Sequence, residues 1–156
     1  MTKNYALITG STAGIGLDIA RELASRGHNI LLTARREDRL KDIAERLTLD
    51  FGVHTDYVVA DLSEPSAPGT IFSFCDSHQY AVNILVNNAG YSINKKFHET
   101  GEEEEEKFLR VLGTSVVALT KRFIPGMLKQ ESGKIMLVSS LAAFAPPATG
   151  WGALYG

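Results

Sequence analysis

Apolar residues follow two alternating patterns along the chain. Short runs that are nearly all apolar predict five strands, at residues 5–8, 29–34, 54–60, 82–86 and 134–138. Strands of this composition, without regular polar alternation, are typical of a parallel sheet that helices cover on both faces.

The segments between these runs predict helices, because their apolar residues recur every three or four positions. The first helix opens at a glycine-rich loop, has the stripe Ile15, Ile19 and Leu23 as its buried face, and ends at Gly27. Further helices are expected at residues 37–50, 71–78 and 102–130, where Pro68 delays the third helix and Pro125 kinks the last. In the helix at 37–50, the expected buried positions are Leu40, Ile43, Ala44 and Leu47. In the helix at 102–130, they are Phe108, Leu112, Val116, Leu119 and Phe123.

This alternation of strands and helices predicts an α/β fold, a doubly wound parallel sheet of the Rossmann-like kind, in one domain over residues 1–156. Right-handed crossovers give the strand order 3-2-1-4-5. In such a sheet, ligands bind at the carboxyl ends of the strands, where the strand order reverses.

The composition narrows the possible functions. The formal net charge is −2, which argues against general nucleic-acid binding. The single cysteine, Cys75, fits a reducing compartment, and we expect a cytoplasmic protein with neither a signal peptide nor a membrane-spanning run. The histidines are scattered without metal-ligand spacing, so we expect no metal site.

The stretch Thr9-Gly10-Ser11-Thr12-Ala13-Gly14-Ile15-Gly16 stands between the first strand and the first helix. Gly10 allows a sharp turn, and Gly14 and Gly16 allow a pyrophosphate and the sheet to approach the backbone. The helix then points free N–H groups at the phosphates. The alternative is a tight turn without a ligand, because the spacing is Gly-x-x-x-Gly-x-Gly rather than Gly-x-Gly-x-x-Gly.

The chain resembles the short-chain dehydrogenase/reductase family in four features taken together. These are the Thr-Gly-x-x-x-Gly-Ile-Gly loop, Asp61-Leu62 after the third strand, Asn87-Asn88-Ala89-Gly90 after the fourth, and Ser140 with Tyr155 after the fifth. The resemblance implies a dinucleotide-binding domain whose cofactor contacts are Gly10, Ser11, Thr12, Gly14, Ile15, Gly16, Asp61, Leu62, Asn88, Ala89 and Gly90. It implies hydride transfer between a nicotinamide cofactor and a carbonyl or the matching alcohol.

The end of the second strand indicates which cofactor is used. An acidic residue there would bind the adenosine ribose 2′-OH and repel a 2′-phosphate. This chain has Arg35 and Arg36 instead, and guanidinium groups pair well with a phosphate dianion. We therefore expect NADP(H) to be preferred over NAD(H); the alternative is that both arginines are solvated charges at a helix start.

By the same resemblance, Tyr155 is the general acid/base and Ser140 holds the substrate carbonyl. The tyrosine would need its pKa lowered from about 10 by a lysine four residues later, a position that lies past Gly156. Leu112 stands where the family has a proton-relaying asparagine, and Ser115 is a possible substitute. Ser140 is also two residues further from Tyr155 than is usual in the family, and Tyr155 could instead be a packing residue.

We therefore expect an NADPH-dependent oxidoreductase that is truncated just after Tyr155, with its last strands missing, and that is inactive in this form. Phe144 and Trp151 favour an apolar carbonyl substrate, and the full-length protein is expected to form a homo-oligomer. The alternative function is a non-catalytic cofactor-binding or interaction module. A third possibility is that the truncated chain does not hold together, because its fifth strand is an exposed edge that favours aggregation or self-association.

Overall fold

The computed structural model describes residues 3–141 and 144 and contains a five-stranded parallel sheet. The strand order is β3-β2-β1-β4-β5, which confirms the predicted doubly wound topology. The strands are β1 (Lys3–Thr9), β2 (Asn29–Ala34), β3 (Thr55–Val59), β4 (Tyr80–Asn87) and β5 (Lys134–Leu137).

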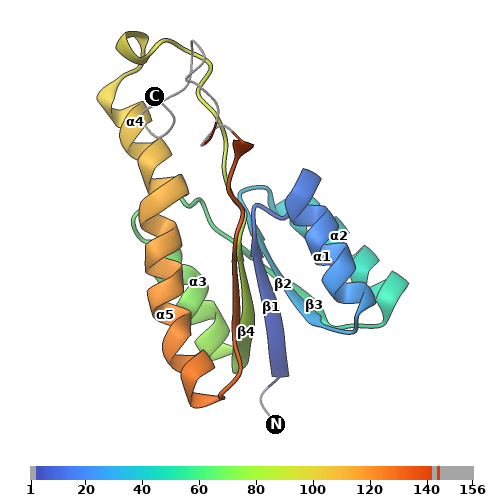
Figure 1. Cartoon of the computed structure of the whole chain (residues 1–156). Helices are drawn as coiled ribbons and strands as arrows, with labels where there is room; N and C mark the ends of the chain where they lie inside the picture. The colour runs from blue at the N-terminus through green and yellow to red at the C-terminus, as the bar shows by residue number, and fades with distance from the viewer. Residues whose placement is uncertain (1–2, 142–143, 145–156) are drawn as a thin grey trace.

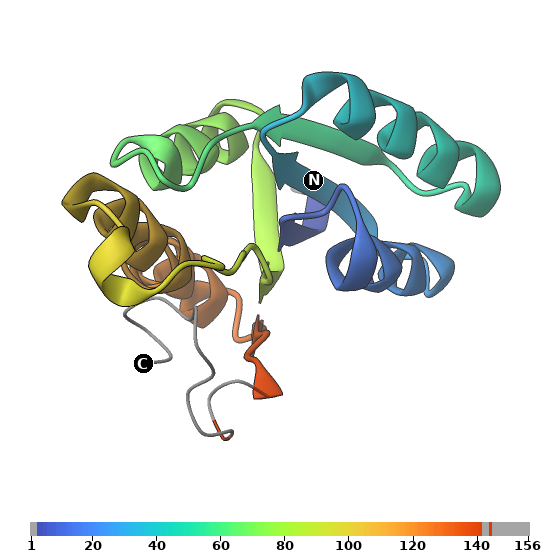
Figure 2. The same cartoon turned by 90° about the horizontal axis from the view of Figure 1, so that it is seen from above.

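Helices cover both faces of the sheet. Helices α1 (Gly14–Ser25) and α2 (Glu37–Phe51) lie on one face, and α3 (Ala67–Ser77) lies with α4 (Glu102–Leu109) and α5 (Ser115–Lys129) on the other (Figures 1 and 2). A short 3-10 turn, η1 (Phe97–Glu99), precedes α4. The sheet is therefore the middle of three layers, as its nearly all-apolar strands predict.

The middle strand β1 is at the centre of the core. Its residues from Tyr5 to Ile8 are fully buried, because side chains on alternate sides enter the two hydrophobic clusters between the sheet and its helices. Tyr5 and Leu7 face the α3 and α5 side, and Ala6 and Ile8 face the α1 and α2 side.

The buried face of α1 differs from the predicted stripe. Gly16, Ala20 and Ala24 are the buried residues of this helix, whereas Ile15 is 60% exposed. Small residues let the helix axis approach the sheet closely, so the tertiary packing selects the small-residue stripe over the larger apolar one. Ile19 and Leu23 pack against the core only in part. Gly27 ends the helix as predicted, with a φ of 83°.

The third helix begins earlier than its sequence suggests. It starts at Ala67 rather than residue 71, with Pro68 in its first turn, where a missing backbone N–H has no cost. Pro68 therefore starts this helix instead of delaying it. Strand β4 is also longer than predicted at both ends.

The long helix after Gly101 contains an irregular turn. Between α4 and α5 the segment η2 (Arg110–Thr114) is π-helical, and the chain then continues as a helix through Pro125. The π turn changes the buried positions to Phe108, Val111, Ser115, Leu119, Phe123 and Met127. Leu112 and Val116, which the sequence places at the centre of the buried face, are only half-buried.

The helical stretch Glu102–Lys129 is long and apolar enough to cross a membrane by length and composition alone. In this structure it packs along the sheet, and Leu119 and Phe123 belong to the core cluster on that face. In this structure, apolar residues of the stretch therefore contribute to the core beside the sheet.

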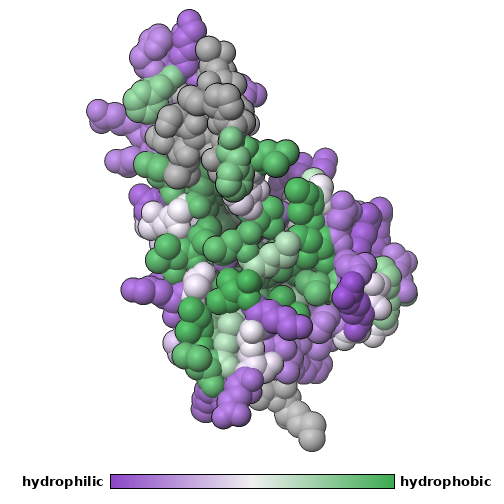
Figure 3. All heavy atoms as spheres, viewed as in Figure 1, coloured by the Kyte–Doolittle hydropathy of each residue, from purple (hydrophilic) through white to green (hydrophobic). Residues whose placement is uncertain are grey.

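Strand β5 is the least buried strand. All four of its residues are exposed, and Ile135, Met136 and Leu137 are 40%, 47% and 61% exposed. Figure 3 shows apolar side chains gathered on the face of the molecule where β5 and the neighbouring helix lie. Within the described residues, β5 pairs with β4 alone and is therefore an edge strand, as expected.

Candidate functional site

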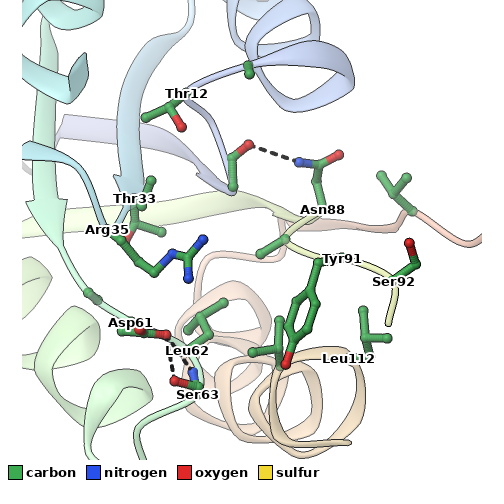
Figure 4. Close-up of a pocket in the computed structure, with 18 of the residues that line it drawn as sticks. Thr12, Thr33, Arg35, Asp61, Leu62, Ser63, Asn88, Tyr91, Ser92 and Leu112 are labelled. Carbon is green, nitrogen blue, oxygen red and sulfur yellow. Dashed lines mark hydrogen bonds between the residues drawn. The ribbon is translucent and has the colours of Figure 1, made fainter. Parts of the chain in front are cut away.

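A cleft of about 1160 Å³ opens at the carboxyl ends of the strands. The segments that follow all five strands contribute to its lining, and it includes the junction of β1 and β4, where the strand order reverses. This is the position that the topology predicts for a ligand. Figure 4 shows side chains from β2, the β3–α3 loop, the loop after β4 and the long helix pointing into it.

The glycine-rich loop forms one side of the cleft. Gly10 has a φ of 66°, which favours glycine, and its N–H donates to the Thr33 carbonyl at 2.9 Å. Gly16 has no room for a side chain, because a Cβ there would collide with the Asn88 amide and the Gly10 carbonyl. Gly14 has a φ of 54° and open space beside it. The loop is therefore fixed on the protein side and open on the side of the cleft.

Thr9 joins this loop to the loop after β4. Its buried hydroxyl accepts hydrogen bonds from the backbone N–H groups of Asn88 and Ala89, both at 2.9 Å, and donates to the Val86 carbonyl at 3.3 Å. The Asn88 side-chain amide donates in turn to the carbonyls of Thr9 and Gly10. The family resemblance predicts a cofactor contact for Asn88 and no role for Thr9. The signal for Thr9 in the sequence is a polar residue at the end of an apolar strand.

Two arginines stand at the end of β2. Arg36 donates from Nη2 to the Thr12 hydroxyl at 3.3 Å, so it connects the end of β2 to the glycine-rich loop. Arg35 extends into the cleft (Figure 4). In the same region the Thr33 hydroxyl is buried and has no hydrogen-bond partner among the described residues. The end of β2 thus offers two cations and an unused donor.

Asp61 and Leu62 form the part of the cleft that follows β3. One carboxylate oxygen of Asp61 accepts both the backbone N–H and the hydroxyl of Ser63, at 2.9 and 2.8 Å (Figure 4). This local turn fixes the carboxylate, and its other oxygen takes part in neither bond. Leu62 is 7% exposed and lines the cleft next to it.

The loop after β4 and the π turn form the opposite side. Leu112 contacts Gly90 closely enough that a Cβ on Gly90 would lie 2.9 Å from it. Ser115, a possible substitute for a relaying asparagine, is buried, and its hydroxyl donates to the Val111 carbonyl at 3.0 Å. Its hydrogen is thus directed along the helix, and Ser115 does not line the cleft.

Tyr91 lines the same side of the cleft and was not predicted. Its ring packs edge-to-face on Phe108 with 5.3 Å between the ring centres. Burial and nearby carboxylates, first that of Glu104, raise the pKa of Tyr91, whereas Arg35 acts to lower it. The phenol is therefore neutral at ordinary pH. The position directly after Asn88-Ala89-Gly90 was the only sequence signal for this residue.

The carboxyl end of β5 closes the cleft. Val138, Ser139 and Ser140 line it, and the Val138 N–H donates to the Asn87 carbonyl at 2.9 Å. Of the other predicted residues of this region, Tyr155 and Trp151 lie outside the described residues. Phe144 is 88% exposed and does not line the cleft.

The structure gathers most of the predicted cofactor contacts in one place. The predicted residues that line the cleft are Gly10, Thr12, Ile15, Arg35, Arg36, Asp61, Leu62, Asn88, Ala89, Gly90 and Ser140. Ser11, Gly14 and Gly16 do not line it. The Ser11 hydroxyl is fully buried and directed at the Thr33 carbonyl, 3.4 Å away. Among the described residues, no group of three or more metal-ligating side chains is placed to hold a metal ion.

The chain is similar to several named proteins and solved structures. An L-xylo-3-hexulose reductase of Hypocrea jecorina (strain QM6a) is 34% identical over an alignment of 158 positions. The match covers 88% of this chain and 52% of that protein. The structure of L-sorbose reductase from Gluconobacter frateurii, complexed with NADPH and L-sorbose, matches with a TM-score of 0.90 at 33% identity, and the match covers 99% of this chain and 58% of that one.

A short-chain dehydrogenase from Sphingobium yanoikuyae, in complex with NADPH, matches with a TM-score of 0.87 at 29% identity, over 98% of this chain and 59% of that one. The chain thus spans between 52% and 59% of the length of these three proteins. A family model described as short chain dehydrogenase matches residues 4–155. The chain therefore belongs to the short-chain dehydrogenase family.

Proposed function

We propose that the protein is an NADPH-dependent oxidoreductase that reduces a carbonyl, or oxidises the matching alcohol. The observation that carries this proposal is the pair Arg35 and Arg36 at the rim of the cleft, with Arg36 bonded to Thr12 of the glycine-rich loop. A phosphate dianion between the end of β2 and the loop would meet two guanidinium groups. An acidic residue that would repel it is absent from positions 34–36.

The residues of the cleft fit a dinucleotide phosphate. Gly10 and Gly14 hold the loop in backbone conformations that leave it open to a diphosphate, and α1 begins directly behind it. The Thr33 hydroxyl, which has no hydrogen-bond partner among the described residues, is a buried polar group that a ligand in the cleft would satisfy. Asp61 adds a fixed acceptor on the side of β3.

When bound, the nicotinamide would supply a hydride. On the protein side, the Ser140 hydroxyl would hydrogen-bond the substrate oxygen at the end of β5, and Tyr155 would donate a proton to it; both roles rest on the family resemblance. Leu112 and Val138 line this part of the cleft, and their apolar side chains favour an apolar carbonyl substrate. Similar proteins are named as reductases of L-xylo-3-hexulose, of L-sorbose and of very-long-chain 3-oxoacyl-CoA, which supports a carbonyl substrate. The two sugars are polar, so these names support the carbonyl and not the apolar character of the substrate.

The test is a titration of the whole protein with NADPH and with NADH. The expected result is a dissociation constant for NADPH at least tenfold lower, because the phosphate adds charge-assisted hydrogen bonds. The Arg36→Ala variant should lose most of this difference. The matched control is Arg46→Ala, which removes an exposed arginine of the neighbouring helix that pairs with Asp42. Equal or tighter binding of NADH to the unmodified protein would contradict the proposal.

A second candidate function is a non-catalytic cofactor-binding or interaction module of the same fold. Two observations favour it: Leu112 brings an apolar side chain to the π turn, and Ser115 uses its hydroxyl within the helix. Retained NADPH binding without reduction of any ketone from a varied panel, in the whole protein, would support this candidate over the enzyme.

We also propose that the whole protein is a homo-oligomer. The outer face of α5 leaves Val117 and Leu128 58% and 72% exposed, and apolar side chains in such positions are commonly covered by another subunit. Light scattering coupled to gel filtration tests this. A monomer at micromolar concentration would contradict it.

A further inference from the structure

Two flat side chains face each other across one part of the cleft. Arg35 enters from the end of β2, and the ring of Tyr91 stands opposite, after β4 (Figure 4). The two groups are close enough for the guanidinium to act on the ionisation of the phenol. A planar cation and an aromatic ring are both surfaces on which a flat heterocycle stacks.

Tyr91 is held in this position by packing and by the backbone. Its ring lies edge-to-face on Phe108, which is fully buried. The chain just before it is fixed by the bonds that join Asn88 and Ala89 to Thr9. The side chain nevertheless remains 44% exposed, on the side of the cleft. A fixed ring with one free face is suited to contact a ligand.

The space between the two side chains has the chemistry of a base-binding slot. Leu62 and Val111 line the same cleft with apolar surface, and both are less than a tenth exposed. Asp61 lies beside Leu62, with one oxygen bonded twice to Ser63. Apolar surface with one acceptor at the edge suits a purine that carries an amino group. The phenol is neutral at ordinary pH, so it does not repel nearby phosphates.

We propose that Tyr91 is a stacking residue for the adenine base, which is held between its ring and the Arg35 guanidinium. This inference rests on the proposed function, since it assumes that the cleft takes a dinucleotide. In the proposed function the glycine-rich loop and the two arginines bind the phosphates, and Tyr91 would add a contact with the base. The prediction concerns the ring of Tyr91 and not its hydroxyl.

The test is the affinity of the whole protein for 2′-phospho-ADP-ribose, measured by calorimetry. This probe carries adenine and the 2′-phosphate but no nicotinamide, so its binding does not depend on turnover. Tyr91→Phe should bind within twofold of the unmodified protein, because the ring is kept. Tyr91→Ala and Tyr91→Leu should both bind about tenfold more weakly or worse.

Tyr91→Leu separates stacking from packing, because leucine still covers Phe108 but offers no aromatic face. If Tyr91→Leu binds as well as the unmodified protein, Tyr91 only supports the loop and the inference is wrong. The matched control is Phe97→Ala, which removes an exposed aromatic side chain of the same loop that does not line the cleft. Thermal unfolding of each variant checks that the fold is intact.

The outcomes separate this inference from the proposed function. Absence of binding of both NADPH and the probe to the unmodified protein overturns the proposed cofactor. Normal binding that none of the Tyr91 substitutions changes overturns only the stacking role.

Discussion

Strands β1 and β5 have similar apolar sequences and very different surroundings. The four residues Tyr5 to Ile8 of β1 are fully buried, whereas Ile135, Met136 and Leu137 of β5 are between 40% and 61% exposed. Strand β1 has a paired strand on each side, and β5 pairs with β4 alone among the described residues. An apolar run therefore predicts a strand, but the neighbours of the strand decide how much of it is buried.

The parts of the cleft at the ends of β1 and β5 differ in burial in the same way. At the end of β1, Thr9 and Asn88 hold two loops together with partly buried hydrogen bonds of 2.9 Å. At the end of β5, Ser139 and Ser140 are exposed. The part of the site that binds the cofactor in our proposal is thus built into the core, and the part that would meet the substrate lies at its edge.

Truncating one apolar residue of each strand gives the largest expected contrast. Leu7→Ala should lower the free energy of unfolding by about 3–5 kcal/mol, because it leaves a cavity in the core, whereas Ile135→Ala should cost less than about 1 kcal/mol. Chemical denaturation of both variants measures this. Similar costs for the two would show that β5 is as well covered as β1 in solution.

The buried hydroxyl of Thr9 can be tested against another buried threonine. Thr9→Val leaves two backbone N–H groups without an acceptor and should cost about 2–4 kcal/mol. Thr33→Val is the matched control, because Thr33 is equally buried and its hydroxyl has no partner among the described residues. It should change stability by less than about 1 kcal/mol. Equal losses of unfolding free energy in the two variants would show that the hydrogen bonds of the Thr9 hydroxyl add no stability.

Cys75 reports on the core around β1 through pH. Burial raises the pKa of its thiol from 9.0 to about 12. The unfolded chain then loses this proton above pH 9, while the folded protein keeps it to about pH 12. The contribution of the buried, neutral thiol to the free energy of unfolding is therefore complete below pH 9 and is lost as the pH rises from 9 to 12.

By pH 11 this loss should reach about 2–3 kcal/mol. The Cys75→Ala variant lacks the thiol, so its unfolding free energy should fall less between pH 8 and pH 11 than that of the unmodified protein. Denaturation of both proteins at the two pH values measures the difference. Parallel losses would indicate that the thiol is accessible to solvent.

The smallest expected effect concerns the loop that follows β1. Gly14→Ala places a side chain in open space but at a φ of 54°, and should cost about 1 kcal/mol. Gly126→Ala is the control, because it also meets nothing within 4 Å but lies inside the helix α5, without a positive φ. That change should be slightly stabilising in thermal unfolding, because alanine favours the helix over glycine. Equal effects would show that the loop adopts another conformation.

Much of the fold and of the site could be predicted from local patterns. The bounds of β2 were predicted fully, because a continuous apolar run followed by Arg35 has a clear end. The place of the glycine-rich loop, of Asp61 and of Asn88 at strand ends was also correct. Each of these follows from residues that are adjacent in the chain.

The errors arose where distant packing decides the outcome. The helix α1 buries Gly16, Ala20 and Ala24 instead of Ile15, because the close approach to the sheet favours small residues. The π turn Arg110–Thr114 moved the buried stripe of the long helix from Leu112 to Val111 and Ser115. The observed stripes recur every four positions, as Ile15, Ile19 and Leu23 also do, so the periodicity of the sequence does not distinguish between them.

The sequence by itself determined the order of strands and helices, the glycine-rich turn and the cations at the end of β2. These depend on local backbone preference and on the spacing of apolar residues, which are properties of short segments. The tertiary structure decided that Thr9 joins two loops, that Arg36 reaches Thr12 and that Tyr91 faces Arg35. These contacts join residues far apart in the chain, so they exist only once the parallel strands bring their carboxyl ends together.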